Sequence, residues 1–474
     1  IAECSGPTRR CRSNRHDRHG VVMAVAAAPV TKALADFVHD APVSCASPRA
    51  TEVVKQGMLD LFGVIIAGSG EPAGCLALNY ARSQAAAGPA AVLAADTRLA
   101  PSLAALVNGT AGHALDYDDI GLGAGHISVA ILPAVFAVAE LVEADGAALV
   151  DALVVGYEVA HRLTTMYPDT RLGPYAAGYH KPSVYSVFGG TSGATRLLGM
   201  DAVATAHALG IAASQSAGLR ANFGTMTKPL HAGIANRTAV EAALLAHSGF
   251  TASTEALEQR FGWHDVICRG EGDLAVVLDG LGERYAIEEG LIFKAYPCCG
   301  ANHYAIDATI ALLREAGLGE PDVASIDVWI ERRNLEDVLV YPWPRTALEG
   351  KFSLAYNVAA ALLDGEVTVD TFTESALRRL ESVREKVRVH SSTELPQNGA
   401  KIKVLTTDGR TLAREQLILR GSIEDPMSWA ELEHKFRTNV RGRIAPDAVD
   451  EAVAAIADLD HLKIMAAISA PLLG

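Results

Sequence analysis

The feature that most constrains the fold is a helical pattern of apolar residues that continues, with few breaks, from Thr31 to about Gly280. Ser47 and Pro48 form a typical helix start, and apolar residues then recur at intervals of three and four over residues 53–65. Further helices are expected at residues 102–115, 129–142, 147–163, 202–217 and 239–247. Because no strands alternate with these helices, the pattern predicts a multi-helix domain rather than a nucleotide-binding sheet.

The pattern changes after about Gly290. Residues 326–330 are β-branched and aromatic, and residues 401–404 alternate polar with apolar side chains before a Thr407-Asp408-Gly409 turn. These features predict strands and a hairpin. Helical patterns lie around them, at residues 305–315, 353–363 and 371–380. The sequence therefore predicts a smaller α+β domain, inserted or appended, and we expect the helical pattern that resumes at Trp429 to pack back on the first domain.

Composition narrows the class of protein. Half of the 474 residues are hydrophobic and a fifth are charged, which excludes a disordered chain. The longest apolar runs, such as residues 129–139, are far shorter than the roughly 20 residues of a membrane span, so we expect no membrane partner. The net charge of −14 repels polyanions, so we expect no nucleic acid partner and a cytoplasmic enzyme. Seven cysteines without a CxxC spacing indicate a reducing compartment and no structural zinc site.

The first residues differ from the rest of the chain. Five arginines fall within residues 1–22, and Met23 would suit a natural start. We expect residues 1–28 to be an extension outside the fold, disordered or not native. An organellar presequence at residues 1–22, or a secretory leader, is the alternative.

The first cluster with chemical potential is His113-Ala-Leu-Asp-Tyr-Asp-Asp119, which precedes a glycine-rich turn and His126. On a helix, His113, Asp116 and Tyr117 would share one face, and the turn could fold His126 back beside Asp116. Three carboxylates in four residues repel one another, so one of them should have a raised pKa or a cationic neighbour. The alternative is an acidic helix end exposed to water. A divalent metal is a further option, but the spacing matches neither a zinc site nor an EF-hand, and we expect no metal.

Three other clusters place histidines and lysines at helix starts or turns, where backbone N–H groups and the helix dipole favour anions. Such residues are also common as helix caps or solvated surface groups. Combined in one protein of negative charge, they would form a cationic pocket for a small di- or tricarboxylate, with Asp116 and a histidine moving protons. The candidate residues in these clusters are Tyr179, His180, Lys228, His231, Lys294 and His303.

These motifs resemble those of the MmgE/PrpD family. The resemblance rests on residues 113–119, His126, residues 227–233 (Thr-Lys-Pro-Leu-His-Ala-Gly) and residues 294–299 (Lys-Ala-Tyr-Pro-Cys-Cys). This family contains 2-methylcitrate dehydratases, cis-aconitate decarboxylases and iminodisuccinate epimerases. The resemblance implies a large helical domain, residues 29–287, to which the C-terminal helices, residues 421–474, return. It also implies an α+β lid domain at residues 288–420, a homodimer, and catalysis with no cofactor.

The resemblance also implies roles for individual residues. Asp116, His126, His180 and Lys228 match the active-site positions of the decarboxylases, and Lys294 matches the lysine of the inter-domain segment. Two departures are notable. The decarboxylases, as we align them, have Thr at the position of Ile120 and a catalytic Tyr at the position of Val338. Both changes remove a hydroxyl, which puts decarboxylation of cis-aconitate in doubt.

We therefore expect a cofactor-free lyase that moves a proton next to a carboxylate and eliminates water or, less readily, carbon dioxide. Lysines and His180 would hold substrate carboxylates, with Tyr179, His231 and His303 as further binding residues. His126, aligned by Asp116, would be the general base or acid. An epimerase that uses the same groups is the alternative. A non-catalytic helical binding protein is the second alternative, against which the presence of His126 and Lys228 argues.

Overall fold

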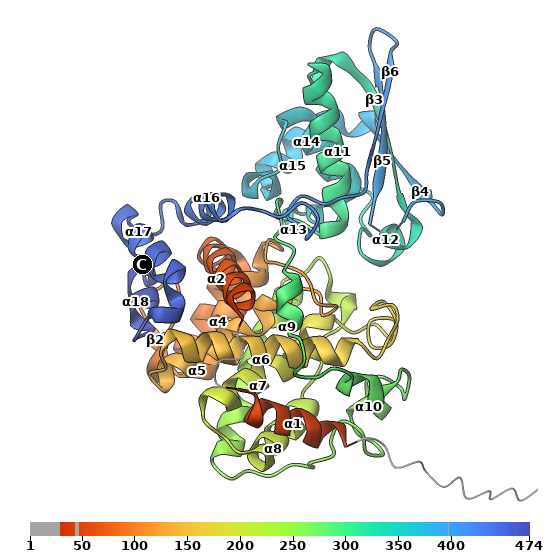
Figure 1. Cartoon of the computed structure of the whole chain (residues 1–474). Helices are drawn as coiled ribbons and strands as arrows, with labels where there is room; N and C mark the ends of the chain where they lie inside the picture. The colour runs from red at the N-terminus through yellow and green to blue at the C-terminus, as the bar shows by residue number, and fades with distance from the viewer. Residues whose placement is uncertain (1–28, 43–46, 397) are drawn as a thin grey trace, which may run out of the picture.

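The computed structural model describes residues 29–42, 47–396 and 398–474, so the expected extension lies outside the described residues. Figure 1 shows a body of packed helices and, above it, a part that combines helices with a sheet. Helices account for most of the described residues, as the sequence predicts for a mainly α protein.

The helical body contains ten α-helices from the first part of the chain that the structure describes, with a few short 3-10 helices between them. They are α1 (Val30–Asp40), α2 (Pro48–Gly68), α3 (Pro72–Ser83), α4 (Pro101–Ala114), α5 (Leu132–Leu141), α6 (Gly146–Thr164), α7 (Lys181–Leu197), α8 (Ala202–Ala213), α9 (Thr227–His247) and α10 (Trp263–Val266).

The contact between α4 and α9 positions the site. Glycines let the two backbones approach closely, because a Cβ atom at Gly233 would lie 2.1 Å from the Thr110 hydroxyl oxygen, and one at Gly109 would lie 2.5 Å from the Asn236 amide nitrogen. The helices run antiparallel, so the end of α4 meets the start of α9. The acidic segment after α4 and Lys228 in the first turn of α9 are thereby brought together.

Four expectations for this part were wrong. Helix α9 begins at Thr227, well before residue 239, and α8 ends at Ala213. Residues 251–290 are mostly turns and short 3-10 helices, since many glycines there have positive φ and interrupt helices. A two-stranded sheet, β1 (Ala87–Ala91) with β2 (Arg98–Leu99), also lies within the helical body.

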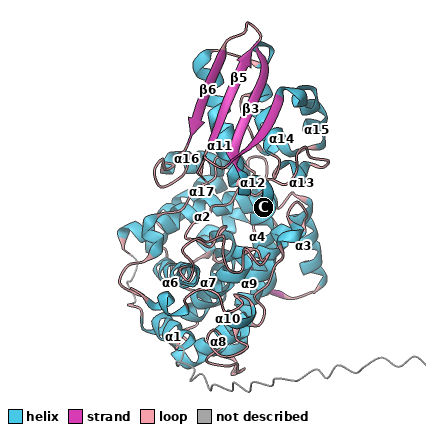
Figure 2. Cartoon of the chain, turned by 90° about the vertical axis from the view of Figure 1, so that its right-hand side faces the viewer, coloured by secondary structure: helices cyan, strands magenta, loops and turns pink. Residues whose placement is uncertain are grey.

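The α+β part is built on a four-stranded sheet in the order β4-β3-β5-β6. The strands are β3 (Val323–Glu331), β4 (Val387–Ser392), β5 (Ala400–Thr406) and β6 (Thr411–Gln416), and Figure 2 shows them side by side. Helices α11 (Gly300–Ala316) and α14 (Leu354–Asp364) pack on the sheet (Figure 1). The predicted hairpin joins β5 and β6, whereas β4, which is parallel to β3, was not expected. Shorter helices complete this part: α12 (Arg332–Asp337), α13 (Ala347–Gly350) and α15 (Glu374–Leu380).

The last helices return to the helical body (Figure 1). Helix α16 (Trp429–Val440) packs on α2, where Phe436 is so close that a Cβ atom at Gly63 would lie 3.0 Å from its ring. Helices α17 (Pro446–Ala457) and α18 (Ala466–Ser469) follow it. The two segments that connect the body to the α+β part run side by side, because the Phe293 N–H donates to the Gly421 carbonyl at 3.0 Å.

No single helix among the described residues is both long and apolar enough to span a membrane. Helices α2 and α3 meet that criterion of length and composition only when they are joined, and the chain bends by 85° between them.

Candidate active site

A cavity of about 280 Å³ lies between the helical body and the α+β part. Five cationic side chains line it, namely Arg171, Lys181, Lys228, Lys294 and Arg333. Two carboxylates, Asp116 and Asp337, also line it. The cavity is therefore positively charged within a protein whose net charge is −14, a combination that favours small anions.

Asp116 is the centre of the charge network. Its Oδ1 lies 2.5 Å from Lys294 Nζ and 3.3 Å from His126 Nε2, and its Oδ2 lies 3.1 Å from Lys228 Nζ. Burial raises the pKa of Asp116, but the two lysines outweigh burial and hold this pKa well below its ordinary value. Asp116 is thus an ionised carboxylate at neutral pH.

The backbone at Asp116 explains how these groups meet. Helix α4 ends at Ala114, and Asp116 adopts the left-handed conformation with φ of +53°. The expectation that His113, Asp116 and Tyr117 share one helical face was therefore wrong. The glycine-rich turn does fold back on itself, with the Gly121 N–H donating to the Gly125 carbonyl at 2.9 Å, and it brings His126 beside Asp116.

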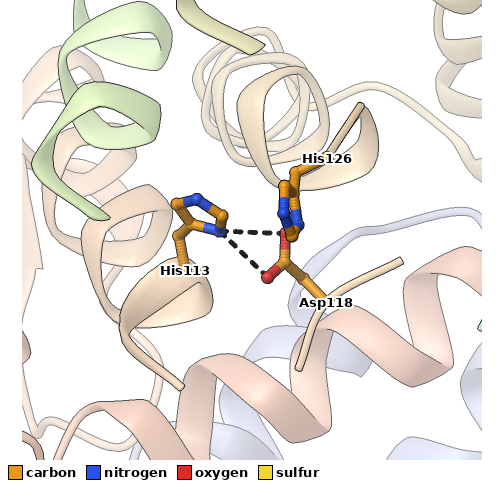
Figure 3. A group of neighbouring side chains, drawn as sticks. All are labelled: His113, Asp118 and His126. Carbon is orange, nitrogen blue, oxygen red and sulfur yellow. Dashed lines mark hydrogen bonds and ion pairs between the residues drawn. The ribbon is translucent and has the colours of Figure 1, made fainter. Parts of the chain in front are cut away.

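Asp118 makes the closest contact with His126. Its carboxylate lies 2.9 Å from His126 Nδ1 and 3.0 Å from His113 Nδ1. Figure 3 shows the three side chains together. A carboxylate only accepts hydrogen bonds, so the shorter contact places the proton of a neutral His126 on Nδ1 and leaves Nε2 unprotonated beside Asp116. Burial lowers the pKa of His126 to about 3, even though Asp118 opposes this shift, so the imidazole is neutral at neutral pH. Asp118, rather than Asp116, is the main orienting partner of His126.

His180 provides a second imidazole. It precedes α7, lines the cavity, and its Nδ1 lies 3.2 Å from His231 Nδ1. Burial is the main cause of two pKa shifts here. It lowers the pKa of His180 well below its ordinary value, and it lowers the pKa of His231 to about 4. Lys228 lines the same cavity as His180. Its ammonium lies 5.5 Å from the Phe223 ring centroid and 5.0 Å from that of Phe352.

The structure thus brings Asp116, His126, His180, Lys228 and Lys294 to one cavity. The other three predicted residues do not line this cavity. His231 lies behind His180, and the backbone of Tyr179 pairs with Leu219. His303 is fully buried, with its Nε2 3.2 Å from the Cys298 carbonyl oxygen.

Arg171 and Arg333 could not be predicted from the sequence, because lone arginines in a turn and in a short helix carry no motif. Nor does the sequence indicate a role for Asp118 separate from that of its neighbours. Ile120 and Val338, the two departures, both line the cavity.

One group among the described residues has ligand atoms close enough to hold a metal ion. It consists of His113, Asp118 and His126, whose potential ligand atoms lie within 4.8 Å of one another (Figure 3). Both Nδ1 atoms lie at hydrogen-bond distance from the Asp118 carboxylate, which is the arrangement of a hydrogen-bonded His-Asp-His array. That catalysis needs no metal or cofactor remains a prediction.

Comparison with known proteins shows the family of this chain. Family models for the MmgE/PrpD N-terminal domain and the MmgE/PrpD C-terminal domain match residues 32–273 and 296–461. The chain belongs to the MmgE/PrpD family. Its relatives include cis-aconitate decarboxylase of Homo sapiens, 29% identical over 92% of both chains. The enzyme of the same name from Mus musculus is 28% identical over 92% of this chain and 91% of its own length. That from Aspergillus terreus is 27% identical over 79% of this chain and 82% of its own length.

Proposed function

We propose that this protein is a lyase that removes a proton from the carbon next to a carboxylate of a small di- or tricarboxylate and eliminates water. The observation that carries the proposal is a cationic cavity in which a neutral imidazole faces an ionised carboxylate. The names of these three relatives, all cis-aconitate decarboxylases, support a lyase. We further propose, from the family resemblance and the acidic composition, a cytoplasmic homodimer.

The cations of the cavity would bind the substrate. Lys228 and Lys294 share a single carboxylate, Asp116, so the trio retains a positive charge that a substrate carboxylate can neutralise. Arg333 can bind a second carboxylate through paired N–H donors, whereas Arg171 already donates from Nε and Nη2 to Asp169 and can add only a weaker contact. Hydrogen bonds from charged donors are about twice as strong as neutral ones, which suits a substrate with several carboxylates.

His126 would act as the general base. Its Nε2 is unprotonated and lies in the cavity, and a proton that arrives there produces an imidazolium between Asp116 and Asp118. The two carboxylates stabilise this imidazolium, whereas Lys228 and Lys294 stabilise the negative charge that develops on the substrate carboxylate. A bound carboxylate would also raise the pKa of His180 and allow this residue to protonate the departing hydroxyl.

The cavity wall bears on which group leaves. Ile120 and Val338 present apolar side chains where the decarboxylases, as aligned above, have hydroxyls. This difference favours loss of water, and an apolar wall suits a methyl-substituted acid of the 2-methylcitrate type. Decarboxylation is the second candidate, supported by the names of the relatives. Epimerisation requires only the same proton transfer, with nothing eliminated.

Incubation with a panel of di- and tricarboxylic acids in deuterated water, followed by mass spectrometry, tests the proposal. A new alkene indicates dehydration, released carbon dioxide indicates decarboxylation, and deuterium incorporation without loss of mass indicates epimerisation. The His126→Gln variant is the matched control, because it keeps a polar side chain but removes the base. Turnover of no acid, or equal turnover by this variant, would contradict the proposal.

A further inference from the structure

Three successive backbone carbonyls around Asp116 each accept a hydrogen bond from a different buried lysine. Lys351 donates to Leu115, Lys294 to Asp116 and Lys435 to Tyr117, each at 2.9 Å. The three lysines come from different parts of the chain. Lys351 follows α13 in the α+β part, Lys294 lies in the connecting segment, and Lys435 belongs to α16 of the C-terminal tail.

The same ammonium groups also hold the segment that carries Lys294. Lys351 donates to the Pro297 carbonyl at 3.0 Å, and Lys435 donates to the Lys294 carbonyl at 2.9 Å. Lys351 and Lys435 therefore each bridge the stretch of chain around Asp116 to the stretch of chain that begins at Lys294. These two short stretches contribute the carboxylate and one of the lysines at the centre of the cavity.

The lysines hold the backbone at Asp116 in an unfavourable conformation. A left-handed φ at a non-glycine residue costs about 1–2 kcal/mol, and Asp116 has a φ of +53°. Cations on the carbonyls of Leu115, Asp116 and Tyr117 favour this conformation over a continued helix, in which such carbonyls accept backbone N–H groups.

Lys351 is the more informative of the two bridging lysines. It is 2% exposed, and it forms no ion pair within the part of the chain that the structure describes. Its ammonium lies 4.2 Å from the centroid of the Phe372 ring, and burial lowers its pKa to about 8. A buried ammonium without a carboxylate partner is costly, so a purely structural position would suit an apolar side chain better.

We propose that Lys351 and Lys435 are positioning residues of the reaction, whose ammonium groups set the place of Asp116 relative to His126, Lys228 and Lys294. Neither lysine lines the cavity, so each acts on the reaction only through the backbone. Because Lys351 belongs to the α+β part, the active geometry of the helical body depends on that part being docked. This inference rests on the proposed function, since Asp116 must take part in the reaction.

The test is Lys351→Met, which keeps an unbranched side chain only one atom shorter and removes the charge. We expect kcat to fall by about tenfold or more, because misplacement of a catalytic group by about 1 Å can cost a hundredfold. KM and the dissociation constant of malonate, used as an unreactive probe, should change by less than about threefold, because the side chains that line the cavity remain. The backbone carbonyl of Lys351 still accepts from the Cys299 N–H and the Asn302 amide, so the fold should be retained.

Lys386→Met is the matched control. Lys386 also lies in the α+β part and donates to a backbone carbonyl, that of Glu320 at 3.0 Å, but it lies outside the site. Equal kcat for the two variants, or a rise in KM that accounts for the whole loss at Lys351, would overturn the proposal. If Lys351→Met does not fold, Lys435→Met combined with Asp60→Asn removes a buried pair as a unit and is judged by the same criteria. Full activity of Asp116→Asn would instead contradict the proposed function itself.

Discussion

Replacement of Asp116 by Asn should reverse the way in which stability depends on pH. In the wild type, Lys228 and Lys294 are 4% and 1% exposed, and Asp116 is the carboxylate in contact with both. The Asp116→Asn substitution would leave two buried ammonium groups without this partner. Removal of one member of a buried ion pair costs about 3–5 kcal/mol, so we expect the variant to unfold at a clearly lower temperature at neutral pH.

The sign of the effect follows from the two pKa shifts. Burial lowers the pKa of Lys294, but Asp116 and, to a lesser degree, Asp118 outweigh burial, so this pKa is raised. The resulting stabilisation is fully present below the unfolded value of 10.5 and is lost as pH rises through the folded value. The lowered pKa of Asp116 gives stabilisation above 3.8 that is lost as pH falls through the lowered value.

In the Asn variant, burial becomes the larger influence on Lys294, and its pKa should fall below 10.5. The unfolded chain then binds more protons than the folded one at alkaline pH, so the stability of the variant should increase as pH rises toward about 10. The measurement is Tm from about pH 4 to about pH 10 for the wild type and the variant. Asp364→Asn, which removes an exposed partner of Arg379, is the control and should cost at most about 1 kcal/mol. Parallel curves for Asp116→Asn and the wild type would refute the reasoning.

Three further changes test the site. Lys228→Met should lower kcat/KM by about tenfold to a hundredfold, because a charge-assisted hydrogen bond of about 1.5–3 kcal/mol to the substrate is lost. Steady-state kinetics would check this at a temperature well below the Tm of the variant, which should itself fall because Lys228 is a buried partner of Asp116. His126→Gln should abolish turnover at every pH from about 5 to about 9, since the base is lost rather than shifted, and a pH profile that merely moves would contradict the assignment. Ile120→Thr combined with Val338→Tyr should increase release of carbon dioxide relative to alkene when both are measured on one acid, and an unchanged ratio would show that these positions do not select the leaving group.

Much of the fold could be predicted from the sequence, and the predictions that failed did so for physical reasons. Helical periodicity predicts α2 and α6 closely because their apolar faces bury in one core. The pattern fails at α9, whose first turns bury Lys228 and His231 together with small residues such as Ala232, so no stripe of large apolar residues marks the start of the helix. It also fails at β4, whose residues are mixed in polarity. Only the parallel pairing with β3 identifies this segment as a strand.

The candidate site could be predicted in outline but not in detail. The spacing of the acidic cluster and the glycine-rich turn correctly indicated that His126 returns to Asp116. It could not show that Asp118 holds the imidazole more closely, because one left-handed residue changes which carboxylate faces which ring. Lys351 and Lys435 left no signal, since the groups that they bind are backbone carbonyls, which every residue carries.

The charge balance of the cavity bears on substrate choice. Asp116 already engages Lys228 and Lys294, so an incoming carboxylate must share these lysines with a buried anion that depends on them to stay ionised. A substrate with a single carboxylate therefore loses hydration and gains only part of an ion pair. In a buried site this desolvation costs more free energy than the partial ion pair returns. A second or third carboxylate changes the balance, because Arg333 and Arg171, the latter already paired with Asp169, also line the cavity. We therefore expect the arrangement that keeps Asp116 ionised also to discriminate against monocarboxylates, since only an acid with a second carboxylate can use the arginines as well as the buried lysines.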